Sequence, residues 1–268
     1  MLHNSQLGKT VHYKSTYDRS LLFALPRALK RAELDLNDHL PFHGVDIWNA
    51  YELSWLNDKG KPIVRLAKFT FPCDSTHIIE SKSFKLYLNS FNQTRFSSAE
   101  IVKNIMQYDL SSAAGAKVRV DFSAVDKPLT IAHFPGICLD DLDIDIQDYQ
   151  PNTHLLSTLD YTVTETVYSN LLKSNCPITH QPDWASVMIR YQGAQIDHKG
   201  LLQYIISFRE HNDFHEHCVE RMFSDILRVC QPEKLTVYAR YTRRGGLDIN
   251  PFRSNFESLG NNLRLSRQ

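Results

Sequence analysis

The two halves of the sequence repeat one pattern of predicted secondary structure. In each half, two strand-like segments rich in aromatic and β-branched residues precede two amphipathic helical segments and one more alternating strand. The first copy has predicted strands at 46–56 and 62–71, helices at 80–91 and 97–106, and a strand at 117–123. The second has predicted strands at 161–172 and 186–192, helices at 199–208 and 214–229, and a strand at 235–241. This repeat predicts an α+β protein built from two tandem copies of one module.

Identical residues recur at a constant spacing between the copies. Lys82 and Lys199 lie 117 positions apart. The same spacing pairs Tyr87 with Tyr204, Ser90 with Ser207, Phe91 with Phe208, Val102 with Val219 and Val120 with Val237. The acidic stretch 138–153 is the predicted connection, although its alternating Leu and Ile are equally compatible with an edge strand. We therefore expect an N-terminal extension at 1–40, modules at 41–137 and 154–268, and the connection between them.

Composition narrows the class of protein. The 268 residues are 42% hydrophobic, which is enough to form a core, and their 30 basic and 30 acidic side chains cancel. Without a net charge, the chain is not drawn to nucleic acid or to an anionic membrane, so a small-molecule partner is expected. Five cysteines with no CxxC pair indicate reduced thiols. Because no stretch approaches the ~20 apolar residues of a membrane-spanning helix, we expect a cytoplasmic protein.

Only the second copy carries a set of reactive side chains. The segment CPITHQPD places Cys176 and Asp183 at the two ends of a loop that prolines restrict, and DFHEH adds His215 and Glu216. Their counterparts in the first copy are Lys59, Leu66, Ser98 and Ala99. A thiol that reacts as its thiolate, beside a proton donor and polar anchors, indicates covalent catalysis.

The first copy differs from the second where its first helix is predicted to begin. It has Glu80, Ser81 and Lys82 at the positions where the second copy has Asp197, His198 and Lys199. Each half therefore contributes different residues, and we expect one site between the two modules.

Structural interpretations of these residues stay open. Cys176 is also compatible with a buried thiol before a loop whose Asp183 caps the next element. Glu80 and Ser81 are compatible with a favourable charge and a cap at a helix start. Other expectations concern packing: a core position for Phe84, Tyr87 and Phe91, buried roles for Cys218 and Cys230, and an exposed helix face for Arg27, Lys30 and Arg31.

The histidines of HNDFHEHC also suggest zinc. His211 and His215 are one helical turn apart, and such a pair can chelate a metal together with His217 or Cys218. The residues alone leave this alternative open; the family resemblance described next implies thiol chemistry, and on that ground we predict no metal.

Five segments resemble one known family in the same order along the chain. They are LPFHGVDIWNAYELSWLNDKGKP, IIESKSFKLYLNSFN, SNCPITHQPDW, SFREHNDFHEHCVER and RRGGLDINPFRSN. The chain is similar to the two-module form of the NADPH-dependent 7-cyano-7-deazaguanine reductases, the nitrile reductases of the queuosine pathway. The resemblance implies a tunnelling fold, in which each module is an antiparallel sheet backed by two helices, and a homodimer.

The same resemblance implies the roles of individual residues. Cys176 adds to the nitrile carbon to form a thioimide, and Asp183 is the general acid that protonates the nitrogen. The deazaguanine base is bound by Ile79, Glu80, Ser81, His215 and Glu216. NADPH is bound by Ser81, Lys82, Arg244 and Gly245. Two NADPH reduce the nitrile to the primary amine. No GxGxxG or phosphate loop in the sequence predicts a nicotinamide cofactor, so NADPH is implied by the resemblance alone.

Two other functions compete with this one. A thiol-dependent hydrolase would use Cys176 to attack an amide or nitrile and His215 as the base, with no cofactor. A non-catalytic deazaguanine-binding module would keep the pocket without turnover.

Overall fold

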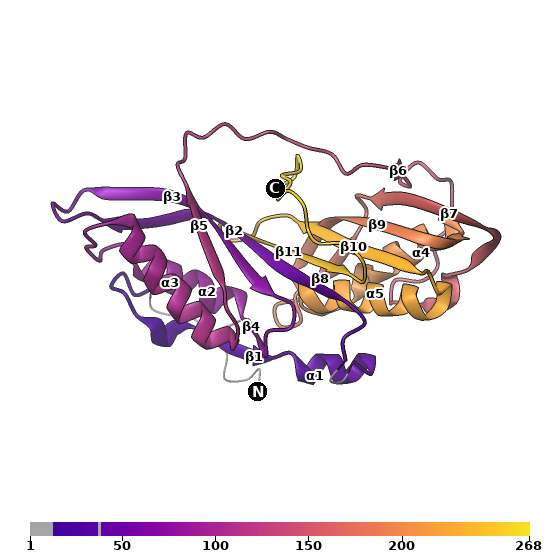
Figure 1. Cartoon of the computed structure of the whole chain (residues 1–268), viewed down its shortest axis with the longest axis horizontal. Helices are drawn as coiled ribbons and strands as arrows, with labels where there is room; N and C mark the ends of the chain where they lie inside the picture. Colours follow the sequence, from indigo (N-terminus) through magenta and orange to yellow (C-terminus); the bar gives the residue numbers. More distant parts are fainter. Residues whose placement is uncertain (1–12, 37–38) are drawn as a thin grey trace. The chain divides into compact units, whose positions relative to one another are not determined.

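The computed structural model describes residues 13–36 and 39–268, which form two compact units. The first unit comprises residues up to 33 together with 46–129 and 243–248. The second comprises 34–45, 130–242 and 249–268. Part of the predicted extension at 1–40, namely residues 1–12 and 37–38, lies outside this description. Both units combine strands with helices (Figure 1), and the predicted α+β class is confirmed.

The first unit contains an antiparallel hairpin extended by a third strand. Its strands lie in the order β5, β3, β2, and β1 pairs separately with β4. Phe84 of the first long helix packs its ring against Trp48 and Phe69 of the strands, at centroid distances of 5.1 and 5.0 Å. The elements are β1 (Ala24–Pro26), α1 (Ala28–Arg31), β2 (His43–Leu56), β3 (Pro62–Pro72), β4 (His77–Ile79), α2 (Ser81–Ser90), α3 (Ala99–Ala114) and β5 (Arg119–Ser123).

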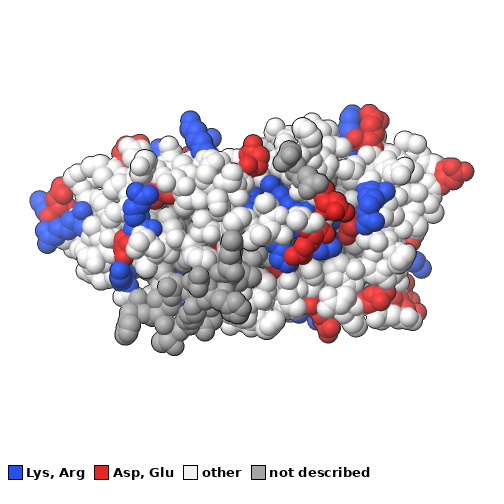
Figure 2. Space-filling model, turned by 90° about the horizontal axis from the view of Figure 1, so that it is seen from below, with Lys and Arg blue, Asp and Glu red and all other residues white. Residues whose placement is uncertain are grey.

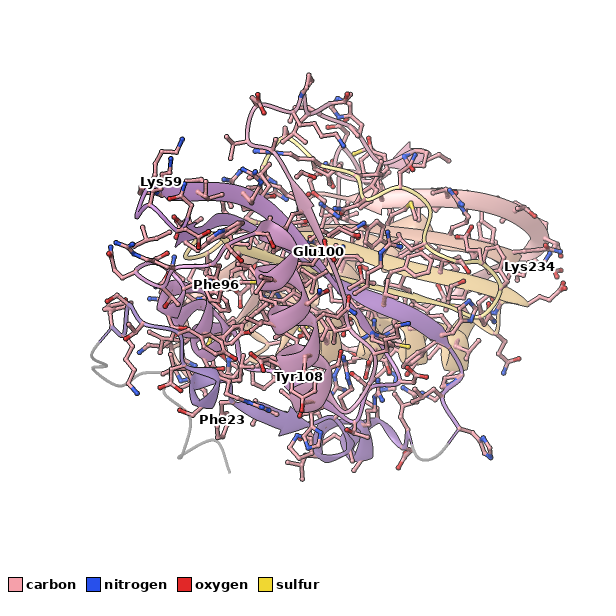
Figure 3. All side chains as sticks on the ribbon, turned by 60° about the vertical axis from the view of Figure 1, so that its left-hand side comes forward. Phe23, Lys59, Phe96, Glu100, Tyr108 and Lys234 are labelled. Carbon is pink, nitrogen blue, oxygen red and sulfur yellow. The ribbon has the colours of Figure 1, made fainter. Side chains whose placement is uncertain are left out.

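Local sequence explains where these elements begin and end. Ser98 accepts a hydrogen bond from the Ile101 amide (3.3 Å) and so caps α3. The helix ends at Gly115, whose φ of 69° is unfavourable for other residues. The β2–β3 turn is closed by Asn57, whose side chain accepts from the amides of Lys59 and Lys61 (3.0 and 2.9 Å; Lys59 is labelled in Figure 3).

The second unit contains a larger sheet with two helices against one face. The strand order is β11, β10, β9, β7, β6, and β8 pairs with the start of β9. Helix α5 packs on β10 and β9. The elements are β6 (Ile137–Cys138), β7 (Thr158–Ser169), β8 (Lys173–Asn175), β9 (Pro182–Ile196), α4 (His198–Ser207), α5 (His215–Cys230), β10 (Lys234–Tyr241) and β11 (Leu247–Ser254).

Every predicted strand and helix is found, with shifted ends, and the predicted core is confirmed because Phe84, Tyr87 and Phe91 are fully buried. Five strands of the described residues were not predicted: β1, β4, β6, β8 and β11. In the acidic stretch 138–153, only Cys138 belongs to a strand, where β6 pairs in parallel with β7. The alternative of an extended edge strand there is wrong.

The expectation of an exposed face around Arg27 is also wrong. Arg27 is 2% exposed, and its Nη2 lies 2.5 Å from Oδ2 of Asp46 in the first strand of the long hairpin. Arg31 is buried too and donates to the Cys73 carbonyl (2.6 Å). Because a buried carboxylate such as Asp46 requires a cation, these arginines lie inside although their spacing suggests a surface helix. Lys30 forms an exposed pair with Glu33.

Charges on the protein surface are mixed in sign. On the face shown in Figure 2, Lys and Arg lie among Asp and Glu and no broad field of one sign forms. No helix of the described residues is both long enough and apolar enough to cross a membrane.

Candidate active site

A short hairpin in the second unit presents Cys176. Strand β8 pairs with the start of β9, so that Asn175 lies opposite Pro182 and Ser174 opposite Asp183. The Cys176 amide donates to the Gln181 carbonyl (2.9 Å), and the His180 amide donates back to the Cys176 carbonyl (3.1 Å). Two backbone hydrogen bonds therefore close residues 176–181, the Cys176 loop.

The register of this hairpin places Asp183 next to the Cys176 loop. Directly opposed residues of an antiparallel pair point to the same face, and successive residues of a strand point to opposite faces. Ser174 and Asp183 therefore share a face. The ladder ends at Asn175 and Pro182, and the hydrogen bond from the Cys176 amide to the Gln181 carbonyl joins the two sides once more beyond it. Cys176 is thus two positions from the residue that faces Asp183. Cys176 and Asp183 are both 4% exposed.

Backbone contacts also fix the start of α5 beside the Cys176 loop. The Asn175 amide donates to the His211 carbonyl (2.8 Å), and the Asp213 amide donates to the Asn175 carbonyl (3.1 Å). On the loop itself, Nδ1 of His180 lies 3.0 Å from Oδ1 of Asn212. These contacts hold the segment before α5 against the residue that precedes Cys176.

His215, the first residue of α5, completes this arrangement. Its Nε2 lies 3.2 Å from Oδ2 of Asp183, and its ring stacks on that of Tyr241 with centroids 3.8 Å apart. The residue is 8% exposed, and the described residues give its Nδ1 no hydrogen-bond partner. A buried polar atom of this kind is suited to a ligand, because burial without a partner costs free energy. Glu216 follows in the first helical turn and is 3% exposed.

The other cysteines are buried or half-buried thiols. Cys218 is fully buried on α5, and burial raises its pKa, with a further increase from Asp213. Burial also raises the pKa of Cys230 to about 11. Both remain protonated near neutral pH, which fits the expectation that they are packing residues. Cys73 is buried, and Cys138 is half-buried.

The base-binding residues expected in the first copy lie at the start of α2. Ile79 pairs with Ala24 of β1, and the Glu80 amide donates to the Phe23 carbonyl (2.9 Å). The Glu80 carboxylate caps α2 by accepting from the amides of Lys82 and Ser83 (2.7 and 2.8 Å). Burial raises its pKa, and these amide hydrogen bonds partly oppose the change. The alternative of Ser81 as the cap is wrong, because Glu80 is the N-cap and Ser81 is the first helical residue.

The expected NADPH residues lie on α2 and on a glycine turn of the same unit. Gly245 and Gly246 have φ of 58° and 78°, so the turn requires left-handed backbone. Lys85 of α2 donates to the Gly245 carbonyl and pairs with Glu52. Lys85 thus joins the helix that carries Ser81 and Lys82 to the turn that carries Arg244 and Gly245. The basic side chains here suit an anionic phosphate.

The predicted residues therefore form two groups. Cys176, Asp183, His215 and Glu216 belong to the second unit. Ile79, Glu80, Ser81, Lys82, Arg244 and Gly245 belong to the first. Sequence reasoning missed Tyr241, Lys85 and the contacts of Asn175. The strand alternation of 235–241 could have indicated Tyr241, since it places that residue on the same face as the apolar Val237 and Ala239.

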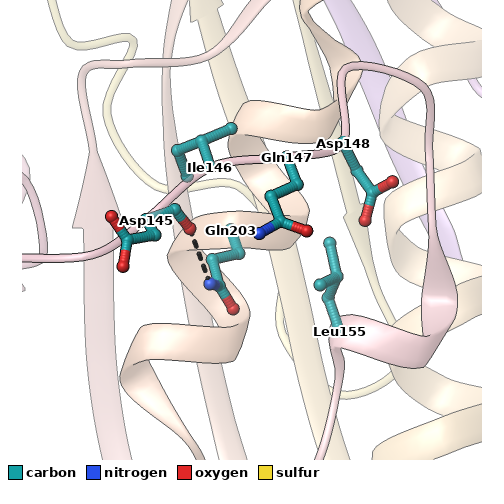
Figure 4. Close-up of a pocket in the computed structure, with 6 residues that line it drawn as sticks. All are labelled: Asp145, Ile146, Gln147, Asp148, Leu155 and Gln203. Atoms are coloured by element: carbon teal, nitrogen blue, oxygen red, sulfur yellow. Dashed lines mark hydrogen bonds between the residues drawn. The ribbon is translucent and has the colours of Figure 1, made fainter.

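Other features of the described residues contribute no further site. Among them, no cluster of three or more His, Cys, Asp or Glu side chains could hold a metal ion. A cavity of about 270 Å³ in the second unit is lined by 145–148, Leu155 and Gln203, and its lining includes none of the predicted site residues (Figure 4). Gln203 donates across it to the Asp145 carbonyl (2.9 Å).

Comparison with known proteins identifies the family. The family described as "Nitrile reductase, 7-cyano-7-deazaguanine-reductase N-term" matches residues 13–122, and that described as "QueF-like protein" matches 182–258. An archaeosine synthase QueF-Like structure in the apo form is 16% identical, with a TM-score of 0.31, and the match covers 38% of this chain and 94% of that one.

Relatives named NADPH-dependent 7-cyano-7-deazaguanine reductase match over nearly their whole length. The protein of Bordetella pertussis is 58% identical, covering 100% of this chain and 99% of the relative. That of Hydrogenovibrio crunogenus is 57% identical, covering 98% and 96%. At this identity and coverage, the chain belongs to the 7-cyano-7-deazaguanine reductase family.

Proposed function

We propose that this protein reduces the nitrile of 7-cyano-7-deazaguanine (preQ0) to the aminomethyl group of 7-aminomethyl-7-deazaguanine (preQ1) with NADPH, in the biosynthesis of the modified tRNA base queuosine. The observations that carry the proposal are the hairpin that joins the Cys176 loop to Asp183 and the contact of Asp183 with His215. The names of the relatives support the nitrile base as substrate and NADPH as the reductant.

Covalent addition is the first step of the proposed mechanism. The Cys176 sulfur forms a bond to the nitrile carbon, and Asp183 delivers a proton to the nitrogen, giving a thioimide. A nitrile is a weak electrophile, so the proton must arrive as negative charge develops on the nitrogen. The β8–β9 hairpin supports this step, because Asp183 faces Ser174, two positions from Cys176.

Reduction completes the reaction. NADPH, when bound, supplies two hydrides in succession to the former nitrile carbon. Two protons are taken up as well: one goes to the nitrogen, which already carries the proton from Asp183, and the other replaces the proton that the enzyme has given up. The carbon–sulfur bond breaks between the two hydride transfers, so that the Cys176 sulfur is freed. Ser81, Lys82, Arg244 and Gly245 would hold NADPH, a role supported by the tether between α2 and the glycine turn.

Base recognition falls to Ile79, Glu80, Ser81, His215 and Glu216 in this proposal. A carboxylate accepts from the ring N–H and exocyclic amine of a guanine-like edge, and charge-assisted hydrogen bonds of this kind are strong. The buried Nδ1 of His215, which lacks a described partner, supplies a further polar contact.

The proposal includes the architecture implied by the resemblance. We place two tandem tunnelling-fold modules at 41–137 and 154–268, joined by 138–153 after an extension at 1–40, in a homodimer. Matched polar contacts support a duplicated module: Tyr87 donates to Asp109, and Tyr204 donates to Asp225, both at 2.8 Å.

Mass spectrometry of the intact protein with 7-cyano-7-deazaguanine and no NADPH tests the proposal. We expect wild type to gain the mass of one base and Cys176→Ala to gain none. On addition of NADPH, two equivalents should be oxidised for each amine formed. Release of an acid without NADPH would instead indicate the hydrolase, and binding without an adduct in wild type would indicate a non-catalytic binding module.

A further inference from the structure

Tyr241 lies on the same face of the second unit's sheet as the proposed general acid. It is the last residue of β10 and pairs with Ala185 of β9. Asp183 precedes Ala185 by two residues, and residues two apart on a strand share a face. The register therefore makes Tyr241 a diagonal neighbour of Asp183, and its side chain is fully buried.

The ring of Tyr241 covers the imidazole of His215. The two rings are parallel to within 3°, with centroids 3.8 Å apart. Both nitrogens of an imidazole lie in the ring plane, so whatever fixes that plane fixes the direction of both. With the plane set by Tyr241, Nε2 meets Asp183 at 3.2 Å, and Nδ1 keeps one direction for a ligand.

Side-chain amides hold the backbone of Tyr241 in place. Oδ1 of Asn250 accepts from the Tyr241 amide (3.1 Å), and Nε2 of Gln268 donates to the Tyr241 carbonyl (3.0 Å). The two amides are joined, because Gln268 also donates to Asn250 (2.8 Å). Strand β11 pairs with Thr236–Tyr238 of β10. Tyr241 lies beyond that pairing, and the two side-chain amides bind its backbone there. The stack thus rests on a fixed support.

We propose that Tyr241 is a positioning residue that acts through His215: its ring fixes the imidazole plane in which His215 meets Asp183 and the base. The inference rests on the proposed function, which gives His215 its role. It requires the aromatic ring of Tyr241 and not its hydroxyl. This role differs from that of an ordinary core residue. Loss of a core residue would impair adduct formation to the same extent whether or not His215 is present.

The test is the rate of adduct formation against the concentration of 7-cyano-7-deazaguanine, with NADPH omitted. We expect Tyr241→Leu to raise the half-saturating base concentration about tenfold, from the free energy of an aromatic stack. Tyr241→Phe keeps the ring and should stay within about twofold of wild type. In a His215→Ala background, Tyr241→Leu should cause no further change, because the residue through which it acts is gone. Tyr241→Met fills the same space without a ring and replaces Tyr241→Leu should that variant fail to fold.

A second measurement needs no substrate. A stacked ring shifts the imidazole C–H signals of His215 upfield in the NMR spectrum, and His215→Ala assigns those signals. The shift should persist in Tyr241→Phe and vanish in Tyr241→Leu. Two results would overturn the positioning role. One is an equal rise in the half-saturating base concentration when Tyr241→Leu is made with His215 present and in the His215→Ala variant. The other is a rise in Tyr241→Phe as large as that in Tyr241→Leu. Wild type that shows the NMR shift but forms no adduct would overturn the proposed function and leave the stack in place.

Discussion

The two units share a polar framework but differ at their hairpin turns. In each, a helix tyrosine donates to an aspartate of the following helix (2.8 Å), and a serine three residues later donates to the carbonyl of that tyrosine. The first unit closes its hairpin with the short turn around Asn57, whereas the second interposes β8 and the Cys176 loop. The contacts that both units share stabilise the fold. We therefore expect the catalytic difference between the units to lie in their hairpin turns.

The helix starts repeat this contrast. Glu80 caps α2 by accepting from two backbone amides, and Asp197 caps α4 by accepting from one. Ser98 caps α3, but Phe214, at the corresponding start of α5, offers no side-chain cap. In the second unit, the helix that carries His215 and Glu216 therefore begins without a stabilising side-chain cap. A local stability loss at a site of function is the pattern expected when residues are selected for chemistry.

The largest effect should come from the hairpin turns. Cys176→Ala should lower NADPH-dependent reduction by more than about 10³-fold, because no other group replaces the nucleophile. Lys59→Ala changes the counterpart in the first unit and should leave the rate unchanged. Absorbance of NADPH with the nitrile base measures both. Near-wild-type turnover by Cys176→Ala would show that the turn of the second unit does not carry the nucleophile.

The next largest effect concerns the general acid. Asp183→Asn cannot deliver a proton and should slow adduct formation by about 10²-fold to 10³-fold. Asp160→Asn, an exposed change on β7 of the same unit, is the matched control. Rapid-mixing mass spectrometry follows the adduct. Equal rates for the two variants would show that another group supplies the proton.

A smaller effect separates the two capping carboxylates. Glu80→Gln should weaken binding of the nitrile base about tenfold, by loss of a charge-assisted hydrogen bond, with little change in NADPH affinity. Asp197→Asn should change neither, because Asn caps a helix as well as Asp. Calorimetric titration of the Cys176→Ala protein measures each affinity. Similar weakening for both ligands would remove Glu80 from base recognition.

The same variant gives a pH test of stability. Burial raises the pKa of Glu80 in the folded protein above its ordinary value of 4.5, so the folded state binds the proton more tightly than the unfolded state. Proton binding by Glu80 therefore stabilises the folded state. This stabilisation is fully present below pH 4.5 and is lost as pH rises through the folded-state pKa. Glu80→Gln lacks this titration, so its stability relative to wild type should improve over that interval in urea unfolding. A constant difference would mean that the carboxylate is not destabilised by burial.

The smallest effect should come from the shared framework. Tyr87→Phe and Tyr204→Phe each remove one buried hydrogen bond and should each lower the free energy of unfolding by about 1 kcal/mol. In Tyr87→Phe, the Tyr17 hydroxyl still donates to Asp109 (2.6 Å), so its loss should be the smaller of the two. Neither should change the rate of reduction. A large loss of activity in one variant alone would show that the two tyrosines are not equivalent.

Local pattern predicted more of the fold than of the site. The helices and long strands follow from periodicity and from caps such as Ser98, which depend on neighbouring residues only. The buried Arg27–Asp46 pair and the short strands β1, β4 and β8 were missed, since their partners are distant or their runs too brief. Within the site, the repeat singled out Cys176, Asp183 and His215. Tyr241 was missed because only its ring contact with His215, 26 positions away in the sequence, connects it with the site.

The makeup of the two units limits how the chain can be divided. Residues 34–45 belong to the second unit although they precede most of the first, and 243–248 belong to the first although they lie deep within the second half. A break at 129 would therefore release fragments that each lack a strand segment of their own fold. Neither fragment should refold alone, and activity should return only on mixing them. Each unit therefore needs a segment from the other half of the chain, so the two units are interlocked along the sequence.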